Sequence, residues 1–172
     1  MEKVIEVLNR MQADGVIEKF AIGGGIATNY YLEPYHTNDV DVFFVPVALG
    51  ESGLVSLEPI YSYLADLGYY PIKEGILIDT WPVQFVAPFK ALQEEAVMQA
   101  RSVDYGGTST FIFTAEYLAA ELLRSGRPKD HLRVFNLIQS KKVDMKVFHD
   151  ILRRHELTDA WEDFRFRYEL EG

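Results

Sequence analysis

The stretch Ala21–Val45, AIGGGIATNYYLEPYHTNDVDVFFV, decides the fold of this 172-residue chain. A short apolar run in it ends at a run of three glycines, residues 23–25, and a second apolar run opens with Asp39 and Asp41. The two apolar runs have the length and composition of buried strands, and the segment between them suits a short helix. The stretch therefore predicts a strand, a glycine-rich turn, a helix and a second strand.

Asp39 and Asp41 are the candidate catalytic residues and metal ligands. In a strand, residues i and i+2 point to the same face, so the two carboxylates would stand ~6.6 Å apart while Val40, Val42 and Phe44 face a core. Carboxylates this close repel each other, and Mg²⁺ or Mn²⁺ relieves the repulsion because hard divalent ions take oxygen ligands. Solvated charges at the end of a strand are the alternative interpretation.

The glycine run has a role that matches a metal site. A glycine-rich turn between a strand and a helix lets backbone N–H groups approach phosphate oxygens closely. A plain turn is the alternative, and an Asp-x-Asp pair alone is common. The order of strand, glycine turn, helix and Asp-x-Asp strand is more specific, and it indicates a nucleotide site.

Composition excludes several classes of function. Apolar residues make up 48% of the chain, which is enough for a packed core, and no Cys is available for disulfides or thiolate metal sites. A net charge of −9 argues against tight non-specific binding of duplex nucleic acid. No apolar run has the length of a membrane span, and the N-terminal MEKVIEVLNR lacks the pattern of a signal peptide. We therefore expect a cytoplasmic protein with no membrane partner.

The pattern along the chain predicts an α/β (α+β) lobe over residues 1–113 and a C-terminal helical lobe over residues 114–172, packed as one compact unit. The elements expected in the first lobe are a helix at 2–12, strands at 20–22 and 40–45, helices at 26–32 and 54–67, a hairpin at 76–86, a helix at 92–100 and a strand at 109–114. The helices expected in the second lobe lie at 115–125 and 128–139, followed by one capped by Asp144 and one capped by Thr158.

The glycines and the segment TNDVDVFF together resemble the signature of the polymerase-beta-type nucleotidyltransferase superfamily. That signature is Gly-Gly or Gly-Ser, a short helix, and two aspartates separated by one apolar residue on the next strand. Within the superfamily, the chain is most similar to the small bacterial group that includes abortive-infection type nucleotidyltransferase toxins. The matching features are Thr37, the strand PVQFVAP, Glu116-Tyr117-Leu118 and Gly126-Arg127-Pro128-Lys129-Asp130, and the resemblance spans about residues 15–140.

The resemblance implies a nucleotidyltransferase-like mixed β-sheet flanked by helices, with a C-terminal helical lobe. It implies that Asp39 and Asp41 hold Mg²⁺ or Mn²⁺ and that an NTP is the substrate. The nucleotide-binding residues that it implies are Gly23, Gly24, Gly25, Thr37, Arg127 and Lys129. The implied reaction transfers a nucleoside monophosphate to a hydroxyl group, and pyrophosphate leaves. For residues 126–130, a plain connection between two helices is the alternative.

The chain departs from the superfamily pattern at the third carboxylate. Active members carry an acid on a later strand, where it helps to hold a metal ion and can deprotonate the acceptor. Gln84 occupies the matching strand here, and a neutral amide cannot act as a base. Asp79, in the preceding turn, is the candidate substitute. His36 and Glu121 also stand where related chains carry basic residues, so the inference of turnover is weaker than the inference of fold.

Three functions therefore remain open. The first is a metal-dependent nucleotidyltransferase whose acceptor is an RNA end, a protein side chain or a small molecule. The second is a non-catalytic nucleotide-binding protein on the same fold, which Gln84 favours. The third is an interaction module of a toxin–antitoxin pair, which would bind a protein partner.

Overall fold

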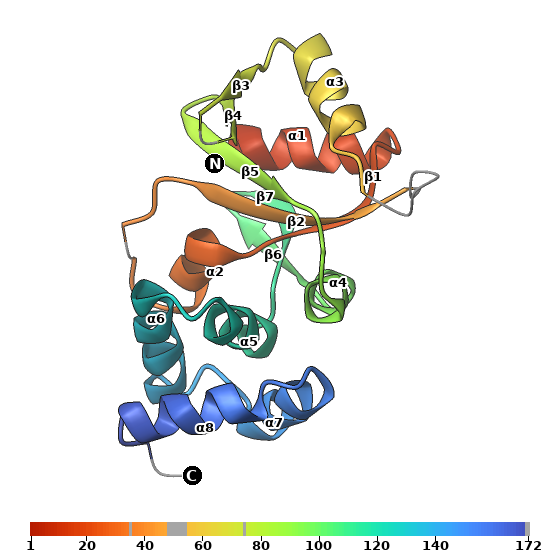
Figure 1. Cartoon of the computed structure of the whole chain (residues 1–172). Helices are drawn as coiled ribbons and strands as arrows, with labels where there is room; N and C mark the ends of the chain where they lie inside the picture. Colours follow the sequence, from red (N-terminus) through yellow and green to blue (C-terminus); the bar gives the residue numbers. More distant parts are fainter. Residues whose placement is uncertain (35, 48–54, 74, 171–172) are drawn as a thin grey trace.

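A mixed seven-stranded sheet forms the centre of the computed structural model, which describes residues 1–34, 36–47, 55–73 and 75–170 (Figure 1). The strand order is β3-β4-β5-β2-β1-β7-β6. The strands are β1 Ile17–Ile22, β2 Val40–Pro46, β3 Pro71–Ile72, β4 Gly75–Ile78, β5 Trp81–Val86, β6 Arg101–Tyr105 and β7 Thr108–Ile112. β2 and β5 are parallel, as are β1 and β7, and the other neighbouring strands are antiparallel.

Helices cover both faces of this sheet. They are α1 Glu2–Ala13, α2 Gly24–Tyr31, α3 Glu58–Asp66, α4 Ala91–Met98, α5 Ala115–Ser125, α6 Pro128–Gln139, α7 Met145–Arg154 and α8 Thr158–Arg167. Figure 1 shows α1 and α3 on one side, and α2, α4 and the C-terminal helices on the other. None of these helices has the length and apolar character needed to cross a bilayer, within the part of the chain that the structure describes.

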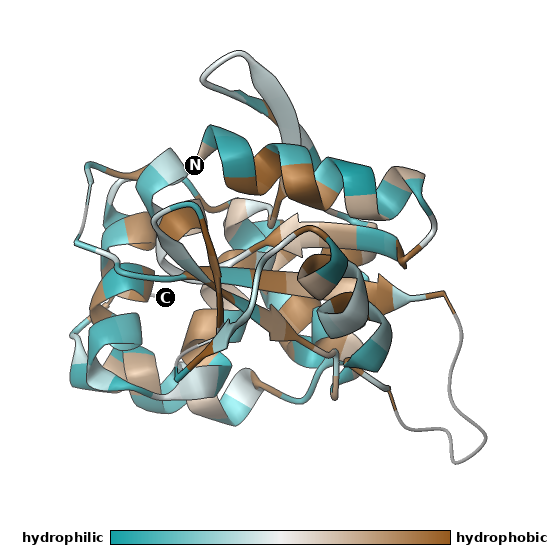
Figure 2. Ribbon diagram, turned by 90° about the horizontal axis from the view of Figure 1, so that it is seen from above, coloured by the Kyte–Doolittle hydropathy of each residue, from teal (hydrophilic) through white to brown (hydrophobic). Residues whose placement is uncertain are grey.

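Helix α1 packs because its apolar residues recur at helical spacing. Val4, Ile5, Leu8 and Met11 have no exposed surface, whereas the charged residues between them face solvent. Brown and teal segments alternate along α1 in Figure 2, as this spacing requires. The helix contacts β1 and β7, so it closes one face of the sheet.

The central strand β2 is buried on both faces. Val40, Val42 and Phe44 are at most 1% exposed, which confirms the prediction that they face a core. Phe43 points to the opposite face, where its ring centroid lies 4.7 Å from that of Phe113. Because side chains alternate along a strand, Asp41 shares the face of Phe43. The first residues of β2 therefore carry a carboxylate toward α2 and the C-terminal helices.

The predicted elements are present, with differences at their ends. The helix expected at 54–67 begins only at Glu58 and ends at Asp66, because residues 55–57 are not helical; the expected first residue, Leu54, lies outside the described residues. The helix expected at 92–100 spans Ala91–Met98. β3 and β6 were not predicted, because one has two residues and the other buries only Val103.

The two predicted helix caps differ in outcome. The Asp144 carboxylate accepts hydrogen bonds from the backbone N–H groups of Lys146 and Val147, which confirms it as the N-cap of α7. The prediction for Thr158 is wrong. Thr158 is the first residue of α8, and Leu157 precedes it as an N-cap without a side-chain hydrogen bond.

Helix α5 joins the sheet layer to the other C-terminal helices. It contacts α2 and α4 on one side and α6, α7 and α8 on the other, and most of its residues are buried.

A polar cluster links the same layers. The Glu95 carboxylate of α4 accepts hydrogen bonds of 2.6 Å from Tyr117 of α5 and from Arg154 of α7, and lies 2.6 Å from the ring Nε2 of His155.

The charge of Glu95 should contribute to stability in a defined pH range. Burial opposes its ionisation, but the hydrogen bonds from Arg154, Tyr117 and His155 outweigh burial and lower the pKa of Glu95 to about 2. The contribution is therefore complete above its ordinary pKa of 4.5 and is lost as the pH falls from there toward 2. We expect Glu95→Gln to lower the free energy of unfolding by about 1 kcal/mol at pH 7, and by less at pH 3. Urea denaturation at both pH values measures this, and equal losses would contradict it.

Candidate functional site

Two carboxylates and a glycine turn meet at the start of β2. Asp41 is largely buried, and burial, followed by the charge of Asp39, raises its pKa to about 6. Asp39 lies just before β2 instead of within it, which corrects the expectation that both aspartates belong to the strand. Even so, the charge of Asp39 acts on Asp41, so the two carboxylates lie within electrostatic range of each other.

Glycine is required at position 24 because the Asp41 carboxylate lies directly against it. Gly24 has φ of 53°, in the left-handed region, and a Cβ atom there would lie 1.9 Å from Oδ2 of Asp41. The neighbouring Gly23 donates its backbone N–H to the Asp41 carbonyl oxygen over 2.9 Å. The turn and the carboxylate are therefore fixed against each other by both backbone and side-chain contacts.

The glycines also begin α2 rather than only preceding it. Gly23 is the N-cap, and Gly24 and Gly25 are the first helical residues. The first N–H groups of any α-helix lack partners within the helix and attract anions. A Cβ atom on Gly25 would lie 2.4 Å from Oγ1 of Thr37 and 3.3 Å from Nη2 of Arg133. A hydroxyl and a guanidinium therefore border the same helix end.

The amide of Gln84 lies beside both aspartates. Asp41 and Gln84 are paired in the parallel register of β2 and β5, and the Gln84 amide donates a 3.1 Å hydrogen bond to Oδ2 of Asp39. Thr37 donates to Oδ1 of the same carboxylate over 3.3 Å. Asp79 instead occupies the exposed turn between β4 and β5, with φ of 56°. The described contacts to Asp39 thus come from an amide and a hydroxyl.

Cations from the start of α6 face the carboxylates. The charges of Arg127, Arg133 and Lys129 each oppose the rise in the pKa of Asp41. Asp130 is fully buried, and its two oxygens bind Arg127 Nε at 2.5 Å and Arg133 Nη1 at 3.0 Å. The sequence predicted Arg127 and Lys129 as nucleotide-binding residues, but it did not point to Arg133 or to the role of Asp130. The spacing of Arg127, Asp130 and Arg133, three residues apart at a helix start, was the available signal.

The donor set fits a divalent ion that keeps open positions. Among the described residues, no group of three or more His, Cys, Asp or Glu side chains is placed to hold a metal ion. Asp39 and Asp41 supply carboxylate oxygens whose mutual repulsion a cation would relieve, and Gly24 leaves the Asp41 carboxylate without a covering side chain. Mg²⁺ is commonly bound through one or two carboxylates and completes its shell with water and phosphate oxygens.

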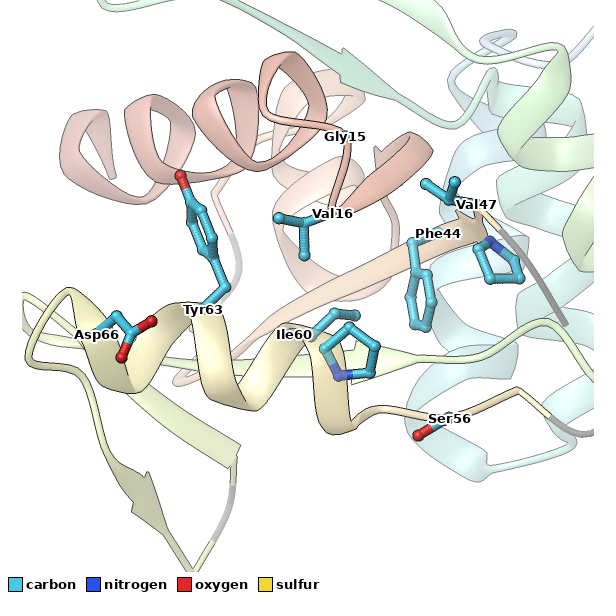
Figure 3. Close-up of a pocket in the computed structure, with 10 residues that line it drawn as sticks. Gly15, Val16, Phe44, Val47, Ser56, Ile60, Tyr63 and Asp66 are labelled. Atoms are coloured by element: carbon cyan, nitrogen blue, oxygen red, sulfur yellow. The ribbon is translucent and has the colours of Figure 1, made fainter. Parts of the chain in front are cut away.

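A separate cavity lies at the other end of β2. It has a volume of about 480 Å³, and Figure 3 shows Val16, Phe44, Ile60 and Tyr63 on its walls. The hydroxyl of Tyr63 donates a 2.6 Å hydrogen bond to Asp14 at the end of α1. The lining is mostly apolar and includes neither aspartate of the carboxylate pair, so this cavity is not part of the candidate site.

The fold has known counterparts among solved structures. A nucleotidyltransferase-like antigenic protein from Paracoccidioides brasiliensis aligns with a TM-score of 0.56 and 15% identity, over 92% of this chain and 90% of that one. The fold is that of the nucleotidyltransferases. ANT(2'')-Ia, solved in complex with adenylyl-2''-tobramycin, aligns with a TM-score of 0.50 and 15% identity over 96% of this chain and 97% of its own. No family model and no curated protein sequence matches the chain.

The contact between Gly24 and Asp41 predicts a large cost for any side chain at position 24. Gly24→Ala would strain a left-handed backbone and also displace the carboxylate, so we expect a loss of about 2–4 kcal/mol in the free energy of unfolding. Gly68→Ala is the matched control, because Gly68 has φ of 85° with open space around its Cβ position. It should lose only the backbone contribution of about 1–2 kcal/mol. Equal losses in denaturation experiments would contradict the close contact.

The raised pKa of Asp41 predicts that neutralising it stabilises the protein without ligand. The folded pKa of about 6 exceeds the ordinary value of 3.8, so ionised Asp41 costs stability above pH 6. We expect Asp41→Asn to add about 1–3 kcal/mol at pH 7.5 in metal-free buffer. The gain should shrink as the pH falls below 6 and should approach zero only below the ordinary pKa of 3.8, where both the folded and the unfolded state bind the proton. A stability curve that shows no gain at pH 7.5 would contradict this assignment.

Proposed function

We propose that the protein is a nucleotidyltransferase that uses Mg²⁺ or Mn²⁺ and moves a nucleoside monophosphate from an NTP to a hydroxyl acceptor. The observation that carries this proposal is the carboxylate of Asp41 lying in contact with Gly24, with Asp39 beside it. A close carboxylate pair next to a glycine-rich helix start combines a metal site with a phosphate site. The nucleotidyltransferase fold supports the same reaction.

Each residue type has a distinct role in this proposal. Asp39 and Asp41 hold the ion, which when bound neutralises charge on the phosphate oxygens. The N–H groups of Gly24 and Gly25 at the helix start bind phosphate, whereas the N–H of Gly23 is already donated to the Asp41 carbonyl oxygen, and Thr37 keeps the Asp39 carboxylate oriented. Arg127 and Lys129 offset the negative charge of the triphosphate, because both face the carboxylate pair. The α/β lobe thus supplies the metal ligands and the C-terminal helices supply the cations.

The acceptor side of the site lacks an obvious base. In the reaction, the acceptor oxygen bonds to the α-phosphorus, the bond to pyrophosphate breaks, and the acceptor loses its proton. Gln84 cannot take that proton, but its amide N–H fixes Oδ2 of Asp39. Asp79 is the nearest acid before it on the chain, and its recruitment would require movement of an exposed turn. The acceptor itself is an RNA end, a protein side chain or a small molecule.

Gln84 favours a second candidate function, a non-catalytic nucleotide-binding protein. In that case the chain would bind an NTP with a divalent ion and release no pyrophosphate. The motifs around Thr37, PVQFVAP and residues 116–118 and 126–130 extend the proposal to the abortive-infection group and to a protein partner of toxin–antitoxin type.

The first experiment measures thermal unfolding and pyrophosphate release with each of the four NTPs, with and without Mg²⁺. We expect one or more NTPs to raise the melting temperature by several degrees only when Mg²⁺ is present. Asp39→Asn should abolish both the shift and the release while the protein stays folded. Lys3→Gln is a control, because Lys3 is an exposed residue of α1, on the face of the sheet opposite to α2 and the C-terminal helices (Figure 1).

Two outcomes would reject transfer, and they differ in what they say about nucleotide binding. A Mg²⁺-dependent shift without pyrophosphate release would reject transfer and support the binding function. Gln84→Glu then tests the missing acid, because an active site that lacks only a base should gain turnover from that substitution. The absence of a shift with every NTP would reject both candidates.

A further inference from the structure

One carboxylate in the C-terminal helices has no exposed surface although it carries a charge. Asp130 accepts hydrogen bonds from Ser125 Oγ at 2.5 Å, Arg127 Nε at 2.5 Å and Arg133 Nη1 at 3.0 Å. Burying a carboxylate is costly unless it is paired and hydrogen-bonded. Both of its oxygens are used here, since Arg127 binds Oδ2 and Arg133 binds Oδ1, so one buried anion holds two arginines.

The two arginines that bind Asp130 differ in how exposed they are and in which part of the site they approach. The side chain of Arg133 is only 11% exposed, and its Nη2 atom borders the Cβ position of Gly25 at the start of α2. Arg127 is 58% exposed, and its charge acts on Asp41. A guanidinium has five N–H donors, and the described bond to Asp130 uses one donor of each arginine, so a ligand could be bound by others. Asp130 thus orients two cations while leaving part of each available.

We propose that Asp130 is a positioning residue that holds Arg133 and Arg127 against the phosphate-binding turn, so that the site binds a polyphosphate chain with pre-arranged charges. This inference rests on the proposed function and adds Asp130 and Arg133 to its residues. A free arginine loses much of its rotamer freedom on binding a ligand, whereas one already held by a buried anion has less to lose. Asp130 therefore acts on the ligand only through the arginines.

The chain offers a matched control for the general effect of losing an ion pair. Glu95 also binds an arginine of the C-terminal helices, Arg154, at 2.6 Å. That cluster joins α4, α5 and α7, and Arg154 does not border the glycine turn. Loss of Glu95 should therefore lower stability without changing the affinity for phosphate.

The experiment measures the dissociation constant of Mg²⁺-tripolyphosphate by calorimetry, which removes any dependence on the base. We expect Asp130→Asn and Arg133→Gln each to weaken binding about ten- to a hundredfold. Because one acts through the other, the double variant should be much less impaired than the product of the two effects. Glu95→Gln should bind like the wild type. If Asp130→Asn does not fold, Ser125→Ala, which keeps the charge and loses one hydrogen bond, should weaken binding by about twofold to fivefold.

Several results would overturn the inference. The first is an unchanged affinity for tripolyphosphate in Asp130→Asn or, where that variant does not fold, in Ser125→Ala. The second is a double variant whose loss of affinity equals the product of the two single losses. The others are an equal loss of affinity in Glu95→Gln and a wild type that does not bind tripolyphosphate. The failure of the proposed function looks different. A wild type that binds tripolyphosphate with the expected coupling but releases no pyrophosphate from any NTP would retain the positioning role and reject transfer. If the wild type releases pyrophosphate but Asp130→Asn binds tripolyphosphate as tightly as the wild type, transfer would be supported and the positioning role would be rejected.

Discussion

The antiparallel pairing of β1 with β2 is the constraint on which the candidate site depends. It aligns Ile22 with Val42, and one residue further the N–H of Gly23 bonds to the carbonyl of Asp41. The end of one strand and the start of the next are thereby placed side by side, and α2 must begin against the Asp41 carboxylate. Only glycine fits at position 24, so the backbone pairing dictates both the turn and the chemistry beside it. The remaining parts of the site are added to this pair from β5 and α6.

The parts of the fold that local pattern determines were predictable from the sequence. The strand, glycine turn, helix and Asp-x-Asp strand each carry their own periodicity or turn chemistry, and an α/β lobe with C-terminal helices followed from them. The mixed sheet was implied by the resemblance to the nucleotidyltransferases. The short strands β3 and β6 were not predictable, because their positions depend on neighbours that hydrogen-bond to them. The burial of Asp130 and the direction of Arg133 were also out of reach. Both depend on how α6 packs against α5 and approaches the start of α2, and an Asp and an Arg three residues apart occur on many exposed helices.

Opposite charges on different layers of the molecule meet at the site. The acids come from the start of β2 and the cations from the start of α6, with the helix start of α2 between them. Gln84 then distinguishes this arrangement from one with three acids, because an amide binds Asp39 where a third negative charge would repel it. The geometry is therefore that of an anion and cation site in which the described side chains relieve the burial and repulsion of Asp41 only in part, so that its pKa stays raised.

The remaining cost of the Asp41 charge has an evolutionary consequence. A buried aspartate whose charge lowers stability can be replaced by asparagine through a single-base change, and the replacement would make the fold more stable. Most random substitutions destabilise proteins, so one that stabilises and is easily reached would spread by drift in a lineage that had no use for the charge. Asp41 thus stands at a position where selection for stability alone would favour asparagine, whereas the proposed binding of a metal ion would favour the aspartate that is present.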